Sequence, residues 1–299
     1  MSRYSRDQSH HEVLGSPSLG HPRPYIEAEL AFRSAHPGNT GDHHDETGDA
    51  RIYDRGLERE HSHSLNESEV KTLTDIGTFR ALAFEDLARH RYGGDLAATR
   101  KHLFTLSRQG LVRSRTSYPE RAVYVTLTRA GYELIARKHE RGNPSQRLYH
   151  DFVNTREARH DAALYRLYQQ EIYRIEHMGG RVRRVILDFE LRQSINRRLA
   201  KLKALPHTEQ VHERQQIARE HGLNVVGGKI LLPDLRLEYD GPDQQLAKVD
   251  LELVTGHYRQ QSLAAKARAG FAMYAFGEDA ARLRPAIGDP EIMQDILSL

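Results

Sequence analysis

Three acidic residues in the second half of the chain have the type and spacing to hold a divalent cation. In the segment KVDLELV (248–254), apolar and polar residues alternate, which is the pattern of a strand with one buried face. Asp250 and Glu252 then project to the same face, and Asp234 stands at the start of the preceding predicted strand. Mg²⁺ prefers such oxygen ligands, activates water and stabilises charge on a phosphate under attack. We therefore expect Asp234, Asp250 and Glu252 to form a magnesium site.

The same residues also have a purely structural interpretation. A Pro-Asp dipeptide such as Pro233-Asp234 is common where strands begin, and Asp250 and Glu252 could line an exposed strand edge. In a site without metal, neighbouring carboxylates repel each other, so one of them would bind a proton or pair with a cation such as Lys266. The acidic residues by themselves leave both interpretations open.

The elements expected around these residues alternate between helices and strands. The predicted elements are helices at 156–178, 191–205 and 208–221, strands at 181–191, 230–232, 235–239 and 247–256, a helix leading into a β-like stretch that ends at 276, and a helix at 290–299. This order predicts an α/β or α+β domain with a partly antiparallel sheet.

The residues before this domain predict three helices followed by a β-hairpin. Ser64 and Glu67 have the spacing of a capping box for the first helix. The second helix ends at Gly93 and Gly94. The remaining elements are a third helix capped by Asp95 and reaching about 109, β-rich runs at 111–117 and 122–128 joined by a turn at 118–120, and a helix from 128. This is the order of a winged helix-turn-helix.

In that arrangement the third helix would enter the major groove of double-stranded DNA. Such a helix needs an apolar face that docks it, here Leu96, Leu103 and Leu106, and a polar face that reaches the DNA. The polar face and the hairpin carry cations that can contact phosphates and base edges. The predicted DNA-binding residues are Arg100, Lys101, His102, Thr105, Arg108, Arg113 and Arg115, with Ala98 on the same stripe and Arg121 beside the hairpin. The alternatives are solvated charges or a protein-binding winged helix.

Two segments of this region resemble the winged-helix regulators of the MarR and PadR type. They are LFTLSRQGLVRSR (103–115) and YVTLTRAGYELI (124–135), and the second matches the Leu-Thr-x-x-Gly exit from the wing. The resemblance covers Leu65–His139 and implies DNA binding by these residues.

The second domain resembles the PD-(D/E)XK nuclease superfamily. The resembling segments are LLPDLRLEY (231–239) and KVDLELVTG (248–256), followed by HYRQQSLAAKARAGFAMY (257–274). With the N-terminal winged helix included, the chain is more similar to the replication-relaxation family of plasmid and mobile-element proteins. In that family HDAALYRLY (160–168) would be the helix start and ILDFELR (186–192) the first acidic strand. This resemblance implies a restriction-endonuclease-like α/β domain.

The resemblance also implies roles for individual residues. Asp234 would be the aspartate of the Pro-Asp motif and Glu252 the second acid. The pattern breaks at Val254, where the superfamily has a lysine. Lys248 on the same strand or Lys266 on the following helix could supply the missing cation, and we favour Lys266. The implied catalytic residues are therefore Asp234, Glu252 and Lys266, with Mg²⁺ as the cofactor.

Composition excludes several classes of protein. The chain has 299 residues, a net charge of +3 and no Cys, which rules out disulfides and Cys-based zinc sites. No apolar run approaches the ~20 residues of a membrane helix, and the N-terminus has no apolar signal segment, so we expect a cytoplasmic protein without a membrane partner. Residues 1–63 are interpreted as a disordered His-rich tail, 64–140 as the winged helix and 150–299 as the nuclease-like domain. The predicted fold class is α+β.

Three functions are compatible with this sequence. The first is a DNA-binding protein of a plasmid or mobile element, used in replication initiation or relaxation, with metal-dependent DNA cleavage if the site is complete. The second is a transcriptional regulator whose nuclease-like domain is inactive, which the residue Val254 favours. The third is a toxin or defence nuclease. The expected partner is double-stranded DNA, and a homodimer is an open option.

Overall fold

The structure is a computed structural model that describes residues 65–143, 145–151, 154–256, 258–286 and 296–298. These residues belong to one compact unit, Leu57–Leu299. The predicted tail over 1–63, with its histidines, lies outside the described residues. No helix among the described residues is both long enough and apolar enough to cross a membrane.

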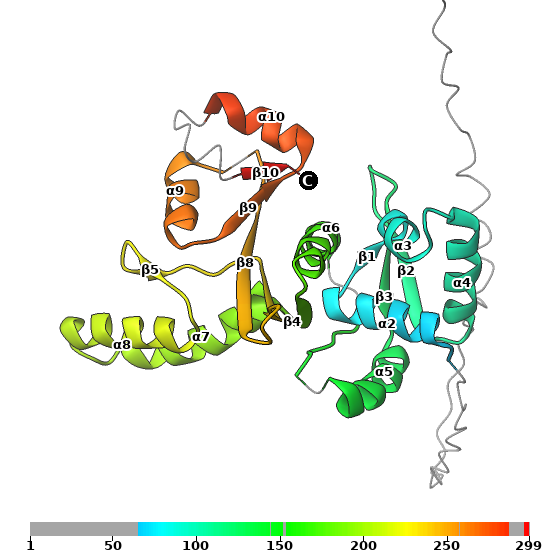
Figure 1. Cartoon of the computed structure of the whole chain (residues 1–299), viewed down its shortest axis with the longest axis horizontal. Helices are drawn as coiled ribbons and strands as arrows, with labels where there is room; N and C mark the ends of the chain where they lie inside the picture. The colour runs from blue at the N-terminus through cyan, green and yellow to red at the C-terminus, as the bar shows by residue number, and fades with distance from the viewer. Residues whose placement is uncertain (1–64, 144, 152–153, 257, 287–295, 299) are drawn as a thin grey trace, which may run out of the picture. The chain divides into compact units, whose positions relative to one another are not determined.

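The described residues form a mixed α+β fold, which confirms the predicted class. Its strands make a three-stranded sheet in the order β1-β3-β2, a five-stranded sheet in the order β10-β9-β8-β7-β4, and a two-stranded ribbon, β5-β6. Figure 1 shows helices lying beside both larger sheets.

The first part of the described chain contains the predicted helices and hairpin. Its elements are α2 (Glu67–Phe79), β1 (Leu82–Ala83), α3 (Phe84–Arg91), α4 (Leu96–Arg108), β2 (Val112–Thr116), β3 (Val123–Leu127) and α5 (Arg129–Gly142). The two-residue strand β1 was not predicted. It pairs with β3 through two residues only, so its sequence is too short to carry an alternating pattern.

The predicted cap of the first helix is wrong by two residues. Asn66 is the N-cap: its side chain accepts a hydrogen bond from the backbone N–H of Glu69, and the Glu69 carboxylate accepts one from the backbone N–H of Asn66. Ser64 lies outside the described residues. Both pairs have the three-residue spacing of a capping box, and Asn is at least as good a cap as Ser, so spacing alone did not separate them.

The glycine of the Leu-Thr-x-x-Gly segment is explained by a close backbone contact. Thr128 caps α5 by accepting a hydrogen bond from the Gly131 N–H, and the Thr128 N–H donates to the Leu111 carbonyl. A Cβ atom at Gly131 would lie 2.0 Å from the Leu111 carbonyl oxygen. Only glycine therefore allows α5 to begin this close to the entry of the hairpin.

The second part of the chain contains the five-stranded sheet. Its elements are α6 (Thr155–His177), β4 (Arg181–Leu187), α7 (Asp188–Leu202), α8 (His207–Glu220), β5 (Val225–Val226), β6 (Lys229–Ile230), β7 (Leu235–Asp240), β8 (Leu246–Val254), α9 (Gln260–Arg268), β9 (Ala272–Ala275), α10 (Gly277–Ala286) and β10 (Ile296–Ser298). β4, β7 and β8 pair antiparallel, whereas β9 runs parallel to β8 and β10 parallel to β9.

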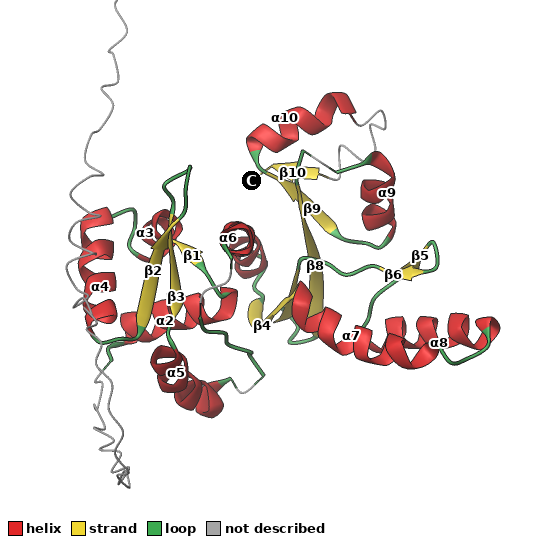
Figure 2. Ribbon diagram, turned by 180° about the vertical axis from the view of Figure 1, so that it is seen from behind, coloured by secondary structure: helices red, strands yellow, loops and turns green. Residues whose placement is uncertain are grey.

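Two predictions in the second part of the chain are wrong. The strand predicted over 181–191 ends at Leu187, because Asp188 begins α7. The helix predicted over 290–299 is contradicted at Ile296–Ser298, which forms the edge strand β10. Pairing with β9 is a long-range interaction that overrides the local preference of so short a segment. Helices α9 and α10 lie beside this end of the sheet (Figure 2).

Helix α6 contributes to one core together with elements from both predicted domains. It packs against α2, α3 and β1 on one side and against β4 and β8 on another. Leu127, Tyr165 and Leu237 belong to the same cluster of buried residues. The Tyr165 hydroxyl also donates a 3.0 Å hydrogen bond to Asp75 of α2. The helix that carries this core therefore contacts both larger sheets.

Candidate functional site

The strand register places Asp234 beside Glu252. β7 and β8 pair antiparallel, with Leu235 opposite Leu251 and Arg236 opposite Asp250. One residue further along this register, Asp234 comes opposite Glu252. Because side chains alternate between the faces of a sheet, both carboxylates project from the same face. The two acids that the PD-(D/E)XK resemblance selected are therefore brought together.

Glu252 is fully buried and has one carboxylate oxygen in use. Its Oε1 accepts a 2.6 Å hydrogen bond from the Tyr258 hydroxyl and lies 2.7 Å from the Lys266 ammonium. Its Oε2 is buried without a hydrogen-bond partner among the described residues. A buried carboxylate oxygen without a donor is costly, so this atom is well suited to receive a cation or a proton.

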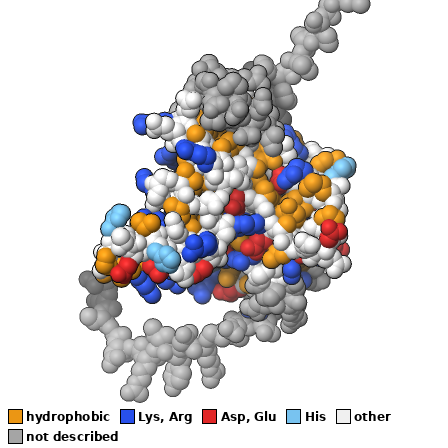
Figure 3. All heavy atoms as spheres, turned by 60° about the vertical axis from the view of Figure 1, so that its left-hand side comes forward, with side chains coloured by type: hydrophobic (Ala, Val, Ile, Leu, Met, Phe, Trp, Pro, Cys, Tyr) orange, Lys and Arg blue, Asp and Glu red, His pale blue; other side chains and the backbone are white. Residues whose placement is uncertain are grey.

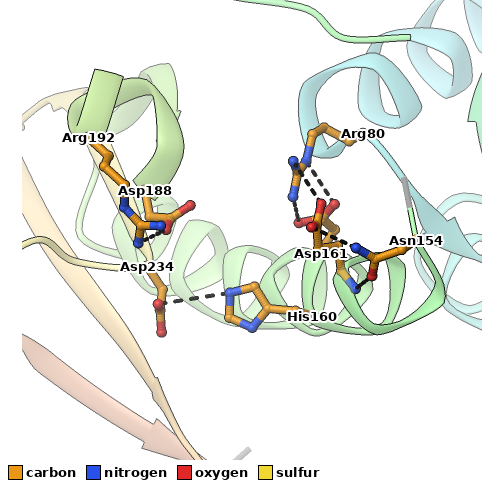
Figure 4. Close-up of polar contacts among 8 residues, drawn as sticks. Arg80, Asn154, His160, Asp161, Asp188, Arg192 and Asp234 are labelled. Carbon is orange, nitrogen blue, oxygen red and sulfur yellow. Dashed lines mark hydrogen bonds and ion pairs between the residues drawn. The ribbon is translucent and has the colours of Figure 1, made fainter. Parts of the chain in front are cut away.

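Asp234 likewise has one oxygen engaged and the other directed at a possible ligand. Its Oδ2 accepts a 2.9 Å hydrogen bond from the backbone N–H of Leu253. Its Oδ1 lies 3.9 Å from Nε2 of His160, a residue of α6 (Figure 4). That separation is too long for a hydrogen bond. Asp234 Oδ1 and Glu252 Oε2 are thus two oxygens that a single cation could use.

Burial makes both carboxylates hard to ionise together. Burial and, to a lesser extent, the charge of Asp234 raise the pKa of Glu252 to about 7, against the opposing effects of Lys266 and Tyr258. Burial also raises the pKa of Asp234 to about 6, against the hydrogen bond from Leu253 and the charge of Lys266. A cation between the two groups would favour their ionised forms. The donor set therefore fits a hard divalent ion that keeps several waters.

Lys266 reaches the acids from α9, as the sequence-based preference for it required. Its ammonium also donates a 2.8 Å hydrogen bond to the Leu232 carbonyl, two residues before Asp234. The alternative, Lys248, instead donates to the Gly222 carbonyl. Val254, at the position where the superfamily has lysine, is buried in an apolar cluster with Leu263. The positively charged side chain near the acids therefore comes from α9 and not from β8.

Asp250 does not join this group, in contrast to its predicted role as a metal ligand. Its two carboxylate oxygens accept hydrogen bonds from Nε and Nη2 of Arg236, at 2.5 and 2.8 Å. Arg236 is itself buried and also donates to the His221 carbonyl. The alternation of the strand gave the correct face for Asp250 but not its partner, which lies opposite it on β7. Asp250 serves as the counter-ion of a buried arginine.

Two residues near Asp234 were not assigned to the site from the sequence. In the sequence, His160 belongs to the segment HDAALYRLY (160–168) and Asp188 to ILDFELR (186–192), and neither was predicted as a ligand. The backbone N–H of Asp188 donates to the Asp234 carbonyl at 3.1 Å, and its side chain pairs with Arg192 at 2.7 Å (Figure 4). Among the described residues, no group of three or more His, Asp and Glu side chains forms a ready-made metal cluster.

The predicted DNA-contacting helix α4 keeps an exposed cationic side. Asp95 caps it by accepting hydrogen bonds from the N–H groups of Ala97 and Ala98, as predicted. Leu103 and Leu106 dock the helix in the core, but Leu96 is 47% exposed and the third docking position is the buried Thr99. The exposed polar residues of this helix are Arg100, Lys101, Thr105 and Arg108.

His102 is placed differently from its prediction as a DNA-contacting residue. Its side chain is mostly buried, with Nδ1 2.5 Å from the Tyr92 hydroxyl and Nε2 3.6 Å from Glu69 of α2. The ring is one position away from Lys101 on the helix, so its side chain points about 100° away, toward α2. This contact stabilises the packing of α4 and removes His102 from the exposed stripe.

The hairpin supplies further exposed cations. Arg113 and Arg115 lie on β2 and Arg121 lies just before β3, and all three are exposed. Arg113 pairs with Thr126 and Arg115 with Tyr124 in the strand register. Tyr124 in turn packs with alanines of β1 and α6. The arginines therefore emerge from the face of the sheet that α6 covers in part.

The basic residues of α7 form a weaker candidate surface. Arg197, Lys201 and Lys203 are exposed, whereas Arg198 pairs with Glu220 of α8. On the face drawn in Figure 3, the described Lys and Arg side chains are interspersed with acidic, His and apolar ones and do not form a continuous patch. This pattern is typical of a solvated surface.

Comparison of the chain with models of known protein families finds no match, and comparison with curated proteins finds no relative. The assignment of a function therefore rests on the geometry above.

Proposed function

We propose that the chain binds double-stranded DNA and cleaves its phosphodiester backbone with a divalent cation, Mg²⁺ being the expected one. In this proposal residues 65–142 act as a winged helix-turn-helix and the second part acts as a PD-(D/E)XK-type nuclease, as in the replication-relaxation proteins of plasmids and mobile elements that the sequence resembles. The observation that carries the proposal is the convergence of Asp234, directly before β7, with Glu252 of β8 and Lys266 of α9.

Each residue of the site has a definite role in this proposal. Asp234 would hold the cation through Oδ1 and Glu252 through Oε2, which has no hydrogen-bond partner among the described residues, and the cation would supply charge neutralisation and an acidified water. Tyr258 and Lys266 both bond to Oε1 of Glu252, which would leave Oε2 available to a cation. In this proposal the Lys266 ammonium would also stabilise the negative charge that develops on a phosphate bound beside the cation.

The exposed stripe of α4 supports the DNA-binding half of the proposal. Arg100, Lys101 and Arg108 are exposed cations on a helix whose opposite side is docked by buried leucines. Recognition helices have this combination, because the apolar side fixes the helix and the cationic side contacts the duplex. The nearby hairpin adds exposed arginines of the same charge.

Cleavage is tested with supercoiled plasmid DNA in the presence of Mg²⁺ or Mn²⁺. We expect nicked or linear product from the wild type, and a loss of about 10²-fold or more in Asp234→Asn and Glu252→Gln, which keep the shape of the side chains but remove the charge. Asp243→Asn is the matched control, because Asp243 is an exposed carboxylate in the β7–β8 loop. A wild type that cleaves no form of DNA with either cation would refute the enzymatic half of the proposal.

A second candidate function is a DNA-binding regulator whose nuclease-like domain is inactive. Two observations favour it: Val254 occupies the usual lysine position, and the Lys266 ammonium is already bonded to Glu252 and to the Leu232 carbonyl. Cleavage by the wild type separates the two functions, and Lys266→Met then tests the role of the lysine. This variant abolishes cleavage if Lys266 acts on the phosphate, whereas a regulator would show specific DNA binding and no cleavage in the wild type.

A further inference from the structure

We propose that His160 is a third ligand of the cation bound by Asp234 and Glu252, and that it shifts the preference of the site from Mg²⁺ toward Mn²⁺ and similar transition-metal ions. The inference rests on the proposed function, since it requires the two carboxylates to hold a cation. It adds a residue from α6, outside the strands and the helix that supply the other site residues.

The distance between His160 and Asp234 suits a shared ion better than a direct bond. Nε2 of His160 lies 3.9 Å from Oδ1 of Asp234. Two ligand atoms that are each about 2.1 Å from one ion lie about 3 Å apart at right angles and about 4.2 Å apart on opposite sides. The observed distance falls inside this interval. An ion could therefore contact both atoms with little movement of the backbone.

The carboxylate oxygens around this point are open to the same ion. Asp234 uses Oδ2 for the Leu253 N–H, which leaves Oδ1 directed at His160. Glu252 uses Oε1 for Tyr258 and Lys266, which leaves the buried Oε2 without a partner among the described residues. Two oxygens and one imidazole nitrogen, completed by water, would make a mixed oxygen and nitrogen set that a first-row transition-metal ion such as Mn²⁺ can accept.

The neighbouring residue on α6 fixes the direction in which His160 points. The Asp161 carboxylate is buried and accepts hydrogen bonds from Nε and Nη2 of Arg80, at 2.9 and 2.8 Å. Adjacent side chains on a helix diverge by about 100°, so anchoring Asp161 toward Arg80 leaves His160 directed at Asp234. Figure 4 shows the two side chains pointing to these different partners.

His160 also has the freedom to complete the site when an ion arrives. Its side chain is 39% exposed, against 18% for Asp234, so solvent and ions can reach the pair from the side of the imidazole. The described residues contain no ready-made group of three ligands, so the imidazole must move toward the ion on binding. Mg²⁺ binds through oxygen donors, whereas first-row transition-metal ions also accept an imidazole nitrogen, so this third ligand shifts the ion preference away from Mg²⁺.

The test measures metal affinity in the full-length protein, by titration calorimetry with Mn²⁺ alone and with Mg²⁺ alone. We expect His160→Ala to weaken Mn²⁺ binding by about tenfold or more and to change Mg²⁺ binding much less. His177→Ala is the matched control, since His177 is an exposed histidine near the end of the same helix, and it should leave both affinities unchanged. Metal binding that persists in Asp234→Asn belongs to other groups of the chain, such as its remaining histidines. This background is subtracted from the binding measured for the wild type and for the other variants.

A spectroscopic measurement on the wild type tests the proposal even if the His160→Ala variant does not fold well. Pulsed electron paramagnetic resonance of the Mn²⁺-loaded protein should detect a ¹⁴N coupling from a bound imidazole, and this coupling should vanish in His160→Ala and in Asp234→Asn. Absence of the coupling in the wild type, or unchanged Mn²⁺ affinity in His160→Ala, overturns the role of His160 alone. If neither Mn²⁺ nor Mg²⁺ binds in a way that depends on Asp234, the cation site of the proposed function fails as well.

Discussion

Arg80 and Asp161 form a two-bond ion pair that joins the end of α2 to α6, at distances of 2.9 and 2.8 Å. The guanidinium of Arg80 also lies 4.4 Å from the centre of the Phe189 ring at the start of α7. One side chain thus contacts the helix that carries His160 and the helix that begins beside Asp234. The predicted DNA-binding part and the acidic site are therefore connected by a short chain of direct contacts.

Removal of Arg80 should be strongly destabilising. In Arg80→Ala the Asp161 carboxylate, which is 1% exposed, would lose its counter-ion, and a buried charge left alone costs about 3–5 kcal/mol. We expect the free energy of unfolding, measured with urea, to fall by that order. The double variant Arg80→Ala with Asp161→Asn should recover a large part of the loss, because no charge is then buried alone. A loss below about 1 kcal/mol in the single variant would show that the pair contributes little.

The two site carboxylates should make stability fall as pH rises. Burial raises the pKa of Asp234 to about 6 and that of Glu252 to about 7, so the folded state binds protons more tightly than the unfolded state. Their contribution to stability is then full below about pH 4 and is lost as pH rises to about 7. Asp234→Asn should remove part of this loss and stabilise the protein above pH 7 by an amount on the order of 2 kcal/mol.

This prediction is checked by urea unfolding at several pH values. Other buried acids, including Asp86 and Asp161, also have a pKa raised to about 6, so the informative quantity is the difference between the wild type and Asp234→Asn. Mg²⁺ or Mn²⁺ should reduce this difference above pH 7, because a bound cation stabilises the ionised pair. Parallel pH profiles of the wild type and the variant would contradict the prediction.

The sequence predicted the acidic pair because a strand has a simple geometry. Alternation with a period of two placed Asp250 and Glu252 on one face of the strand. Asp234, at the start of the preceding predicted strand, was expected beside Glu252. Alternation could not show that Arg236 of the neighbouring strand would take both oxygens of Asp250, because that depends on the register between strands. The position of His160 beside Asp234 is a contact between a helix and a strand about 74 residues apart, for which one sequence carries no signal.

The first part of the chain shows the same division between local and long-range information. Asp95, the turn before β3 and the helix from Arg129 follow from capping and turn preferences, which act within a few residues. The burial of His102 depends on Tyr92 and Glu69, which come from two other parts of the chain. Spacing along the helix placed His102 at the edge of the outer stripe. It could not show that the ring would turn toward Tyr92 and Glu69, because spacing carries no information about neighbouring elements.

A methyl group at Gly131 should disturb the junction between the hairpin and α5. The Cβ of alanine would lie 2.0 Å from the Leu111 carbonyl oxygen, which belongs to the backbone and cannot rotate away. We expect Gly131→Ala to reduce the free energy of unfolding by about 2–3 kcal/mol, although alanine is the better helix former. Gly77→Ala is a useful comparison, because its new Cβ would meet the side-chain end of Leu127 and should cost less. Equal stability of Gly131→Ala and the wild type would require a different arrangement of this junction.

The exposed stripe of α4 gives a prediction about salt. Replacing Lys101 and Arg108 by Ala should weaken binding to double-stranded DNA and reduce the slope of log affinity against log salt by about 0.9 for each phosphate that the variant no longer neutralises. His102→Ala should reduce stability, since its ring packs between Tyr92 and Glu69, and should leave that slope unchanged. Arg129→Ala is the control, because this exposed arginine pairs with Glu133 on α5. Fluorescence anisotropy at several salt concentrations measures the wild type and the three variants. An unchanged slope in the double variant would remove α4 from the DNA interface and leave the arginines of the hairpin as the remaining candidates.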